Sequence, residues 1–150
     1  MKSILLCCCF VMTVTIARSQ GAEDSVKKVI NDLFVAMKQS SKTGISICFA
    51  DSAVLQTIAR DKTGKLIVKN ESITNFAASV AHAEAGSLDE RISFSMIKID
   101  GDLASVWTPY SFYYKNKFSH CGVNSFQLVR TSDGWKIQYL IDTRRKDKCL

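Results

Sequence analysis

The chain has 150 residues, of which 47% are hydrophobic and 23% are charged, and its formal net charge at pH 7 is +6. This length suits one domain around one hydrophobic core, and the absence of internal repeats, linkers and low-complexity segments excludes a multidomain array. The positive charge does not form a basic stripe interleaved with stacking aromatics, so it does not indicate a nucleic-acid partner.

The N-terminus has the three-part pattern of a secretory signal. A basic start is followed by the apolar run Ile4–Ile16 and by the small-residue stop Ala17-Arg18-Ser19. The run is shorter than the roughly 20 apolar residues of a membrane span. The sequence therefore predicts a cleaved signal peptide at 1–19, a domain at 20–150, no stable membrane span, and a periplasmic or secreted location. A buried N-terminal helix or strand is the alternative; a lipid anchor at Cys7–Cys9 is disfavoured, because the apolar run continues past these cysteines.

Removal of the signal would leave three cysteines, Cys48, Cys121 and Cys149. An odd number in an oxidising compartment allows one disulfide and one free thiol. Cys48 lies in an apolar turn, so we expect it to be a buried, unpaired side chain. Elimination favours a Cys121–Cys149 pair, although connectivity cannot be read from spacing alone.

The elements in chain order predict an α+β fold. Val26, Ile30, Leu33 and Met37 share one face of a first helix, which Asp24 or Ser25 would cap. Turn signals and apolar alternation then predict a short helix at 44–49, strands at 53–60 and 65–69, a helix from Asn70 or Ser72 to Gly86, and strands at 92–99, 103–115, 119–130 and 135–143. Pro109 predicts an edge or a bulge in the third-last strand, because proline cannot donate to a ladder. Helices first and strands last are typical of the α+β class.

Two segments carry a resemblance to a known superfamily. Residues 49–54, Phe-Ala-Asp-Ser-Ala-Val, resemble the helix-to-strand corner of nuclear transport factor 2-like proteins, and residues 126–143 resemble their last hairpin. The chain looks most similar to the lumazine-binding-like and SnoaL-like group of small exported bacterial proteins. The resemblance implies a cystatin-like cone, in which a curved antiparallel sheet packs on N-terminal helices, and a homodimer through the outer sheet face. It does not imply one activity, because this fold hosts many.

Strand alternation assigns side chains to the two faces of such a sheet. The inward face is predicted to hold Val106, Thr108, Tyr110 and Phe112, then His120, Asn124, Phe126 and Leu128, then Ile137, Tyr139 and Ile141. Trp107, Tyr113 and Gln127 are expected to point outward, and Asp142 away from the face of Tyr139. The predicted ligand site has Tyr110, Phe112 and Tyr139 as walls and His120 and Asn124 as polar anchors, and would take a small apolar or aromatic molecule. Alternatively, these aromatics fill the interior as core.

Ketosteroid isomerase-like members of the superfamily use a tyrosine, an aspartate base and a second acid. The resemblance places Leu33, Thr57 and Asn124 at these three positions. Leucine and threonine do not titrate, so the sequence argues against this mechanism, and no catalytic residue, metal ligand or cofactor is predicted.

Two further functions stay open. One is an isomerase, cyclase or hydratase with an acid–base set centred on His120, since histidine titrates near neutral pH. His120 and Cys121 are strand neighbours and face opposite sides, so they are not expected to form a nucleophile–base pair. The other is a protein-interaction module that uses Trp107 and the outer sheet face.

Overall fold

The computed structural model describes the backbone of residues 4–149 and the side chains of residues 20–149. The predicted signal peptide, residues 1–19, lies outside the described side chains. The helices are α1 (Ile4–Lys38), α2 (Lys42–Ser46) and α3 (Ile73–Ala81). The strands are β1 (Phe49–Arg60), β2 (Leu66–Glu71), β3 (Leu88–Ile92), β4 (Met96–Asp100), β5 (Leu103–Tyr114), β6 (Lys117–Thr131) and β7 (Gly134–Thr143).

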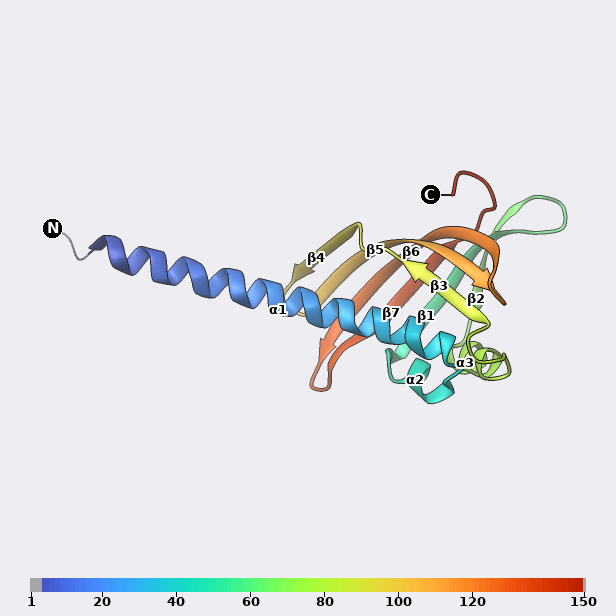
Figure 1. Ribbon diagram of the computed structural model, residues 1–150, viewed down its shortest axis with the longest axis horizontal. Helices are drawn as coiled ribbons and strands as arrows, with labels where there is room; N and C mark the ends of the chain where they lie inside the picture. Colours follow the sequence, from blue (N-terminus) through green and yellow to red (C-terminus); the bar gives the residue numbers. More distant parts are fainter. Residues whose placement is uncertain (1–3, 150) are drawn as a thin grey trace.

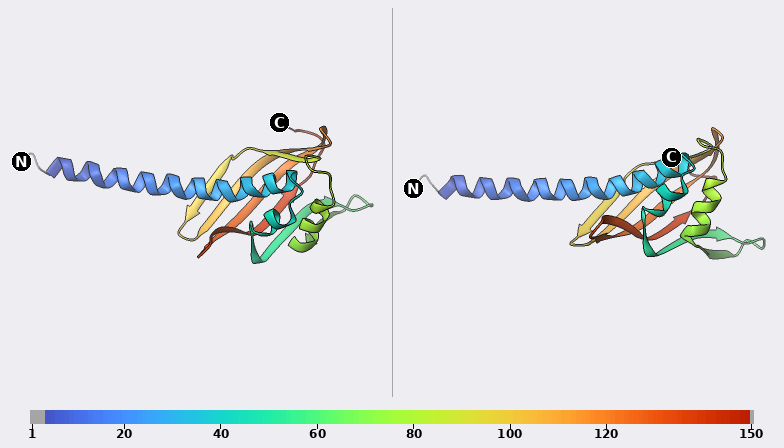
Figure 2. Two further views of the ribbon diagram at one scale, coloured as in Figure 1. Left: turned by 60° about the horizontal axis from the view of Figure 1, so that its bottom comes forward. Right: turned by 90° about the horizontal axis from the view of Figure 1, so that it is seen from below.

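Helix α1 lies along the sheet with the apolar face that its periodicity predicts. Val26 and Ile30 are fully buried and Leu33 is 1% exposed, while the first half of the helix extends beyond the sheet (Figures 1 and 2). The helix starts at Ile4, not at Asp24 or Ser25. Ser25 does not cap a helix start, because its hydroxyl donates to the Gly21 carbonyl one turn earlier, at 2.7 Å.

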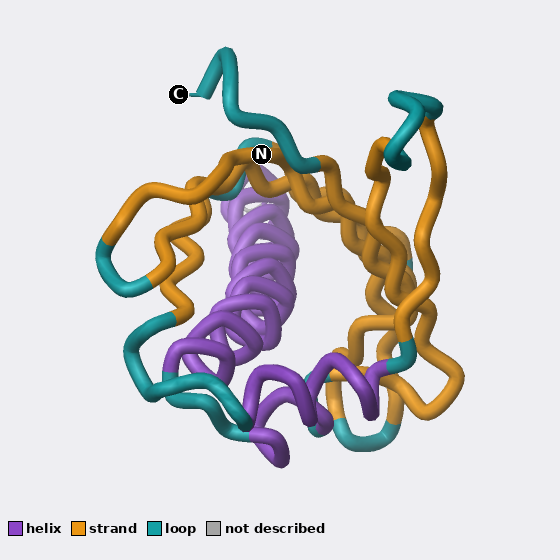
Figure 3. The backbone as a smooth tube through the Cα atoms, turned by 90° about the vertical axis from the view of Figure 1, so that its right-hand side faces the viewer, coloured by secondary structure: helices purple, strands orange, loops and turns teal. Residues whose placement is uncertain are grey.

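The sheet has seven strands in the order β2-β1-β7-β6-β5-β3, with β4 also paired to β5. It curves around the helices, as Figure 3 shows, which confirms the predicted α+β cone. The sheet is mixed, however, because β1 pairs with β7 in parallel. The other strand pairs are antiparallel. Strand β1 follows helix α2 in the chain and joins the sheet beside β7, the last strand, in the same direction.

The strand expected at 92–99 is divided into two. Strands β3 and β4 pair with the same edge of β5, one after the other. Pro109 lies opposite the break, where Ser93 N donates to its carbonyl at 3.0 Å and Ser95 N donates to the Trp107 carbonyl at 3.1 Å. Since Pro109 has no N–H, a continuous partner strand would lack one ladder bond at this position.

The core lies between α1 and the concave face of the sheet. Phe34 of α1 packs edge-on against Phe126 of β6, with ring centroids 6.3 Å apart. Val106, Leu128 and Ile137 are at most 1% exposed. The inward assignment of β5 and of β6 up to Leu128 is therefore confirmed.

Within residues 4–149, no helix combines the length and the apolar composition that crossing a bilayer requires.

A bulge in β7 changes the face assignment of the last strand. Gln127 pairs with Tyr139, but the next residue, Leu128, pairs with Ile137. Gln138 is therefore an extra residue on β7. One extra residue inverts the inward–outward alternation of everything that follows it.

The prediction that Tyr139 and Ile141 point inward is consequently wrong. Leu140 and Asp142 occupy the inner face and are 6% and 7% exposed. The Tyr139 hydroxyl instead donates to Gln56 Oε1 at 2.6 Å, away from the core.

The C-terminal tail is fastened to the sheet by the predicted disulfide. Cys121 and Cys149 are bonded, with their Cα atoms 5.7 Å apart. Cys121 and Arg145 also exchange two backbone hydrogen bonds of 2.9 Å. Cys48 is buried, and it is the free cysteine of the described part of the chain. This arrangement holds residues 144–149 beside the end of β7.

Candidate functional site

A cavity of about 200 Å³ lies inside the cone, between α1, α3 and the inner face of the sheet. Most of its wall is apolar, and its polar groups come from six strands and the segment after β7. The lining residues are Leu33, Phe34, Met37, Leu55, Thr57, Glu71, Phe76, Val80, Leu88, Glu90, Tyr110, Phe112, His120, Asn124, Leu140, Asp142 and Arg144.

Two helices close the apolar side of the cavity. Helix α1 supplies Leu33 and Phe34 from its buried stripe. Helix α3 supplies Phe76 and Val80, and its position is set by Ser72, whose hydroxyl accepts a bond of 3.1 Å from Asn75 N. This cap satisfies one of the backbone N–H groups that a helix start leaves unpaired.

Glu90 is the central polar group of the cavity. It lies on β3 with its side chain on the inner face, and Asn124 Nδ2 donates to its Oε1 at 2.8 Å. The pKa of this carboxyl is raised to about 7, mainly by burial and also by the nearby charge of Asp142, against the opposing effects of Asn124 and Arg144. Among the described residues, Glu90 forms no ion pair. Glu90 is thus a half-buried residue whose carboxyl lies inside the cavity and exchanges protons near neutral pH.

Asp142 lies in a separate hydrogen-bond network of the same cavity. Arg144 Nε donates to its Oδ2 at 2.9 Å and Thr57 donates to its Oδ1. The Tyr110 hydroxyl donates to the Thr143 carbonyl at 2.8 Å and lies 3.5 Å from Asp142 Oδ2. Burial and the Asp142 charge raise the pKa of Tyr110, so its hydroxyl stays protonated. The Arg144 side chain is 54% exposed and marks the solvent end of the cavity.

His120 forms part of the aromatic wall. Its ring lies 4.9 Å from that of Phe112 and 5.7 Å from that of Tyr110. Its described hydrogen-bond partner is the Ser119 hydroxyl, 3.1 Å from Nδ1. Burial, together with the positive charge of Arg144, lowers the pKa of His120 below 6.5. The imidazole is therefore neutral at pH 7 and has no carboxylate bonded to it.

The structure brings together four of the five residues predicted for the ligand site: Tyr110, Phe112, His120 and Asn124 line the cavity. Tyr139 does not, because the bulge at Gln138 turns it to the outer face. The three positions aligned with an isomerase site, Leu33, Thr57 and Asn124, also line the cavity.

Sequence reasoning missed the four charged groups of the cavity, Glu71, Glu90, Asp142 and Arg144. Glu90 lies between Leu88 and Ile92 on the same face of β3, and an acid at such an apolar position could have indicated a site residue. It was missed because the strand was predicted to start only at residue 92. Asp142 was assigned to the outer face because the bulge at Gln138 leaves no mark in the sequence.

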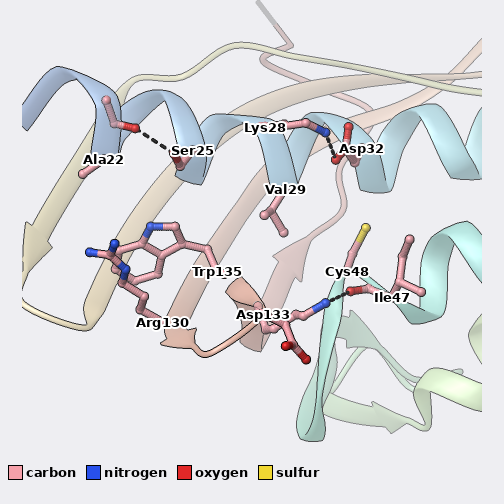
Figure 4. A pocket seen from close by; sticks show the side chains of 13 residues that line it. Ala22, Ser25, Lys28, Val29, Asp32, Ile47, Cys48, Arg130, Asp133 and Trp135 are labelled. Carbon is pink, nitrogen blue, oxygen red and sulfur yellow. Dashed lines mark hydrogen bonds and ion pairs between the residues drawn. The ribbon is translucent and has the colours of Figure 1, made fainter.

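A wider groove of about 770 Å³ lies between residues 21–32 of α1 and the β6–β7 turn, with Trp135 as one wall (Figure 4). Three of its charged groups are engaged: Lys28 pairs with Asp32 at 2.6 Å, and Lys136 Nζ donates to the Ile47 carbonyl at 2.6 Å. The inner cavity is the stronger candidate, because its Glu90 carboxyl lies inside the cone and has no cationic partner among the described residues. In the described part of the chain, no group of three His, Cys, Asp or Glu side chains could hold a metal ion.

No family model matches the sequence, and no curated protein matches it significantly. Solved structures do match. An NTF2-like protein with a cystatin-like fold from Novosphingobium aromaticivorans has a TM-score of 0.71 at 10% identity, over 91% of this chain and 90% of that one. An NTF-2-like protein of unknown function from Silicibacter pomeroyi has a TM-score of 0.67 at 14% identity, over 85% and 98%. A domain of unknown function with a cystatin-like fold from Nostoc punctiforme has a TM-score of 0.66 at 14% identity, over 85% and 80%. The chain thus has the nuclear transport factor 2-like, cystatin-like fold.

Proposed function

We propose that this protein binds a small molecule in the cavity around Glu90. The observation that carries the proposal is a hollow interior, mostly apolar, into which a buried carboxyl and the Asn124 amide both face. Apolar walls with a few convergent polar groups are typical of ligand sites. The alternative, in which aromatics fill the cone completely, is disfavoured because a space of about 200 Å³ remains between them.

The proposal is tested by filling the cavity. Leu88 is partly buried against the core and lines the cavity, so Leu88→Trp would place an indole in the ligand space. Leu103 is 49% exposed and lies outside the cavity, so Leu103→Trp is the matched control. In a ligand-observed NMR screen of small molecules, hits should bind the wild type and Leu103→Trp and lose binding to Leu88→Trp. Hits that bind all three proteins equally would contradict the proposal.

A proton-transfer enzyme is the second candidate, and the observation that favours it is the pKa of about 7 at Glu90. An acid whose pKa lies near the working pH both accepts and donates protons efficiently. This candidate centres the chemistry on Glu90 rather than on His120. For any cavity ligand that is converted, Glu90→Gln should abolish turnover and His120→Ala should retain it; the reverse pattern would restore the histidine-centred hypothesis.

We also infer that the protein is exported to the periplasm or secreted. The tripartite pattern of residues 1–19 supports this inference, and the Cys121–Cys149 disulfide is consistent with an oxidising compartment. N-terminal sequencing of the protein from a bacterial host's exported fraction should give a chain that starts at Gln20. An intact Met1 would contradict cleavage.

A further inference from the structure

The charges that line the cavity are mostly negative. Three carboxyl groups, from Glu71, Glu90 and Asp142, face a single guanidinium, that of Arg144. Arg144 is already engaged, because its Nε bonds to Asp142 and its Nη2 lies 3.3 Å from Thr57 Oγ1. The cavity therefore contains more negative charge than its own cation can neutralise.

Among the described residues, Glu90 is the acid inside the cavity that lacks a cation, because Asp142 pairs with Arg144 and Glu71 is exposed to solvent. Its described hydrogen bond comes from a neutral amide, and no described lysine or arginine lies within ion-pair distance of it. A buried carboxylate without a cation is costly, and a positively charged ligand would remove that cost. An anionic ligand would instead add to the negative charge already present.

Aromatic rings surround the same space. Phe112 and Tyr110 lie on either side of His120, and helices α1 and α3 add the rings of Phe34 and Phe76. Aromatic faces carry a negative quadrupole and attract ammonium groups, most strongly in a desolvated site. The carboxylates and the aromatic ring faces therefore both favour a positively charged ligand.

We propose that the ligand is a small organic cation, a primary amine whose ammonium group lies between the Glu90 and Asp142 carboxyls and whose apolar part packs on the aromatic wall. This inference rests on the proposed function, since it names the chemical class that the cavity takes. The ammonium supplies three N–H donors, which suit acceptor oxygens on two sides.

Binding of an amine would be linked to pH through Glu90. The groups that face this carboxyl are Asn124, Asp142, Arg144, Tyr110, His120 and Glu71. Near pH 6 the Glu90 carboxyl holds its proton, which an ammonium must displace, whereas near pH 8 the carboxylate is already formed. Amine affinity should therefore rise severalfold from pH 6 to pH 8 in the wild type, and this rise should disappear in Glu90→Gln.

The test compares three probes of similar shape by isothermal titration calorimetry at pH 8: 2-phenylethylamine, the neutral 2-phenylethanol and the anionic 3-phenylpropanoate. Because the ammonium group and the Glu90 carboxylate form a hydrogen bond between charged groups, the amine should bind with roughly tenfold higher affinity than the alcohol. Glu90→Gln should remove this advantage, and Glu84→Gln, whose carboxyl is 72% exposed on the surface, should keep it.

The outcomes separate the two proposals. Tighter binding of the alcohol or of the propanoate than of the amine would overturn the cation inference and leave small-molecule binding intact. An amine preference that persists in Glu90→Gln would also overturn it. If no probe of any charge binds the wild type, both the cation inference and small-molecule binding in this cavity are contradicted.

Discussion

Gly122 shows how a single residue sets the geometry behind the cavity. A Cβ at this position would lie 1.8 Å from the Thr143 carbonyl oxygen and 2.7 Å from Tyr110 Cε1. The absence of a side chain therefore lets the Tyr110 hydroxyl reach the Thr143 carbonyl. Glycine is required at position 122 because the backbone of β7 approaches closely at Thr143.

Gly122→Ala should destabilise the protein by about 1–3 kcal/mol, the usual cost of overpacking a core. Urea denaturation measures this change. Gly21→Ala is the control, because nothing lies within 4 Å of the added Cβ there. Equal stability of Gly122→Ala and the wild type would show that the strand spacing is looser than described.

Glu90 gives the stability of the protein a distinctive pH dependence. Its folded-state pKa, about 7, lies above its ordinary value of 4.5, so the folded protein binds the proton more tightly than the unfolded chain does. The contribution of this group to the free energy of unfolding is then fully present below about pH 4.5 and is lost as the pH rises toward 7. The loss is on the order of 3 kcal/mol.

Glu90→Gln keeps an acceptor for Asn124 but cannot ionise. Relative to the wild type, this variant should gain stability between pH 5 and pH 8, as measured by chemical denaturation across that range. Glu84→Gln, on the exposed surface, should follow the wild-type profile. A constant difference between wild type and Glu90→Gln at every pH would contradict a raised pKa.

At the scale of elements, the C-terminal tail depends on the disulfide. The Cys121–Cys149 bond closes a loop with a sequence separation of 28. Closing a loop of that length stabilises the folded state by about 3–4 kcal/mol in the chain-entropy account. The bond also holds the tail that carries Arg144, whose guanidinium pairs with Asp142.

A Cys121→Ala/Cys149→Ala variant should lose about 3 kcal/mol of stability in a urea titration. Added reductant should lower the stability of the wild type toward that of the double variant and leave the double variant unchanged. A wild type that is equally stable with and without reductant would contradict a stabilising role.

The elements also show what the sequence can and cannot predict. Helix α1 and strand β5 follow from period and alternation, because one face of each is buried and the other is not. The break between β3 and β4 could be predicted only by knowing that both strands pair with β5. Pro109 of β5 marked where the break lies. Tyr139 and Asp142 were assigned to the wrong faces because the bulge at Gln138 is set by pairing with β6, not by any turn residue of its own.

The sequence predicts the aromatic and uncharged polar residues that line the candidate site, but it does not predict the charged ones. Tyr110, Phe112, His120 and Asn124 lie on strands whose alternation is regular. Glu90 comes within hydrogen-bond distance of Asn124 only because β3 and β6 pair with the two sides of β5. No local pattern contains this juxtaposition between distant segments.

At the scale of the whole molecule, the outer sheet face is a candidate for self-association. Trp107 is 43% exposed and pairs across the sheet with Met96, which is also 43% exposed. Exposed aromatic and methionine side chains are enriched at protein interfaces. We propose that a homodimer forms through this face.

Trp107→Lys should then give a monomer in size-exclusion chromatography with light scattering. Val35→Lys is the control and should not change the oligomeric state, since Val35 is 52% exposed and lies on helix α1, not on the outer sheet face. A wild type that is monomeric at high concentration would refute the dimer, and so would a dimer that Trp107→Lys leaves intact.

The central claim is that the cone encloses a ligand around Glu90. Native mass spectrometry of the protein from its own host's exported fraction tests it most directly. The wild type and Leu103→Trp should retain the same small adduct, and Leu88→Trp, which fills the cavity, should not. An identical adduct on all three proteins, or none on the wild type after gentle isolation, would contradict the claim.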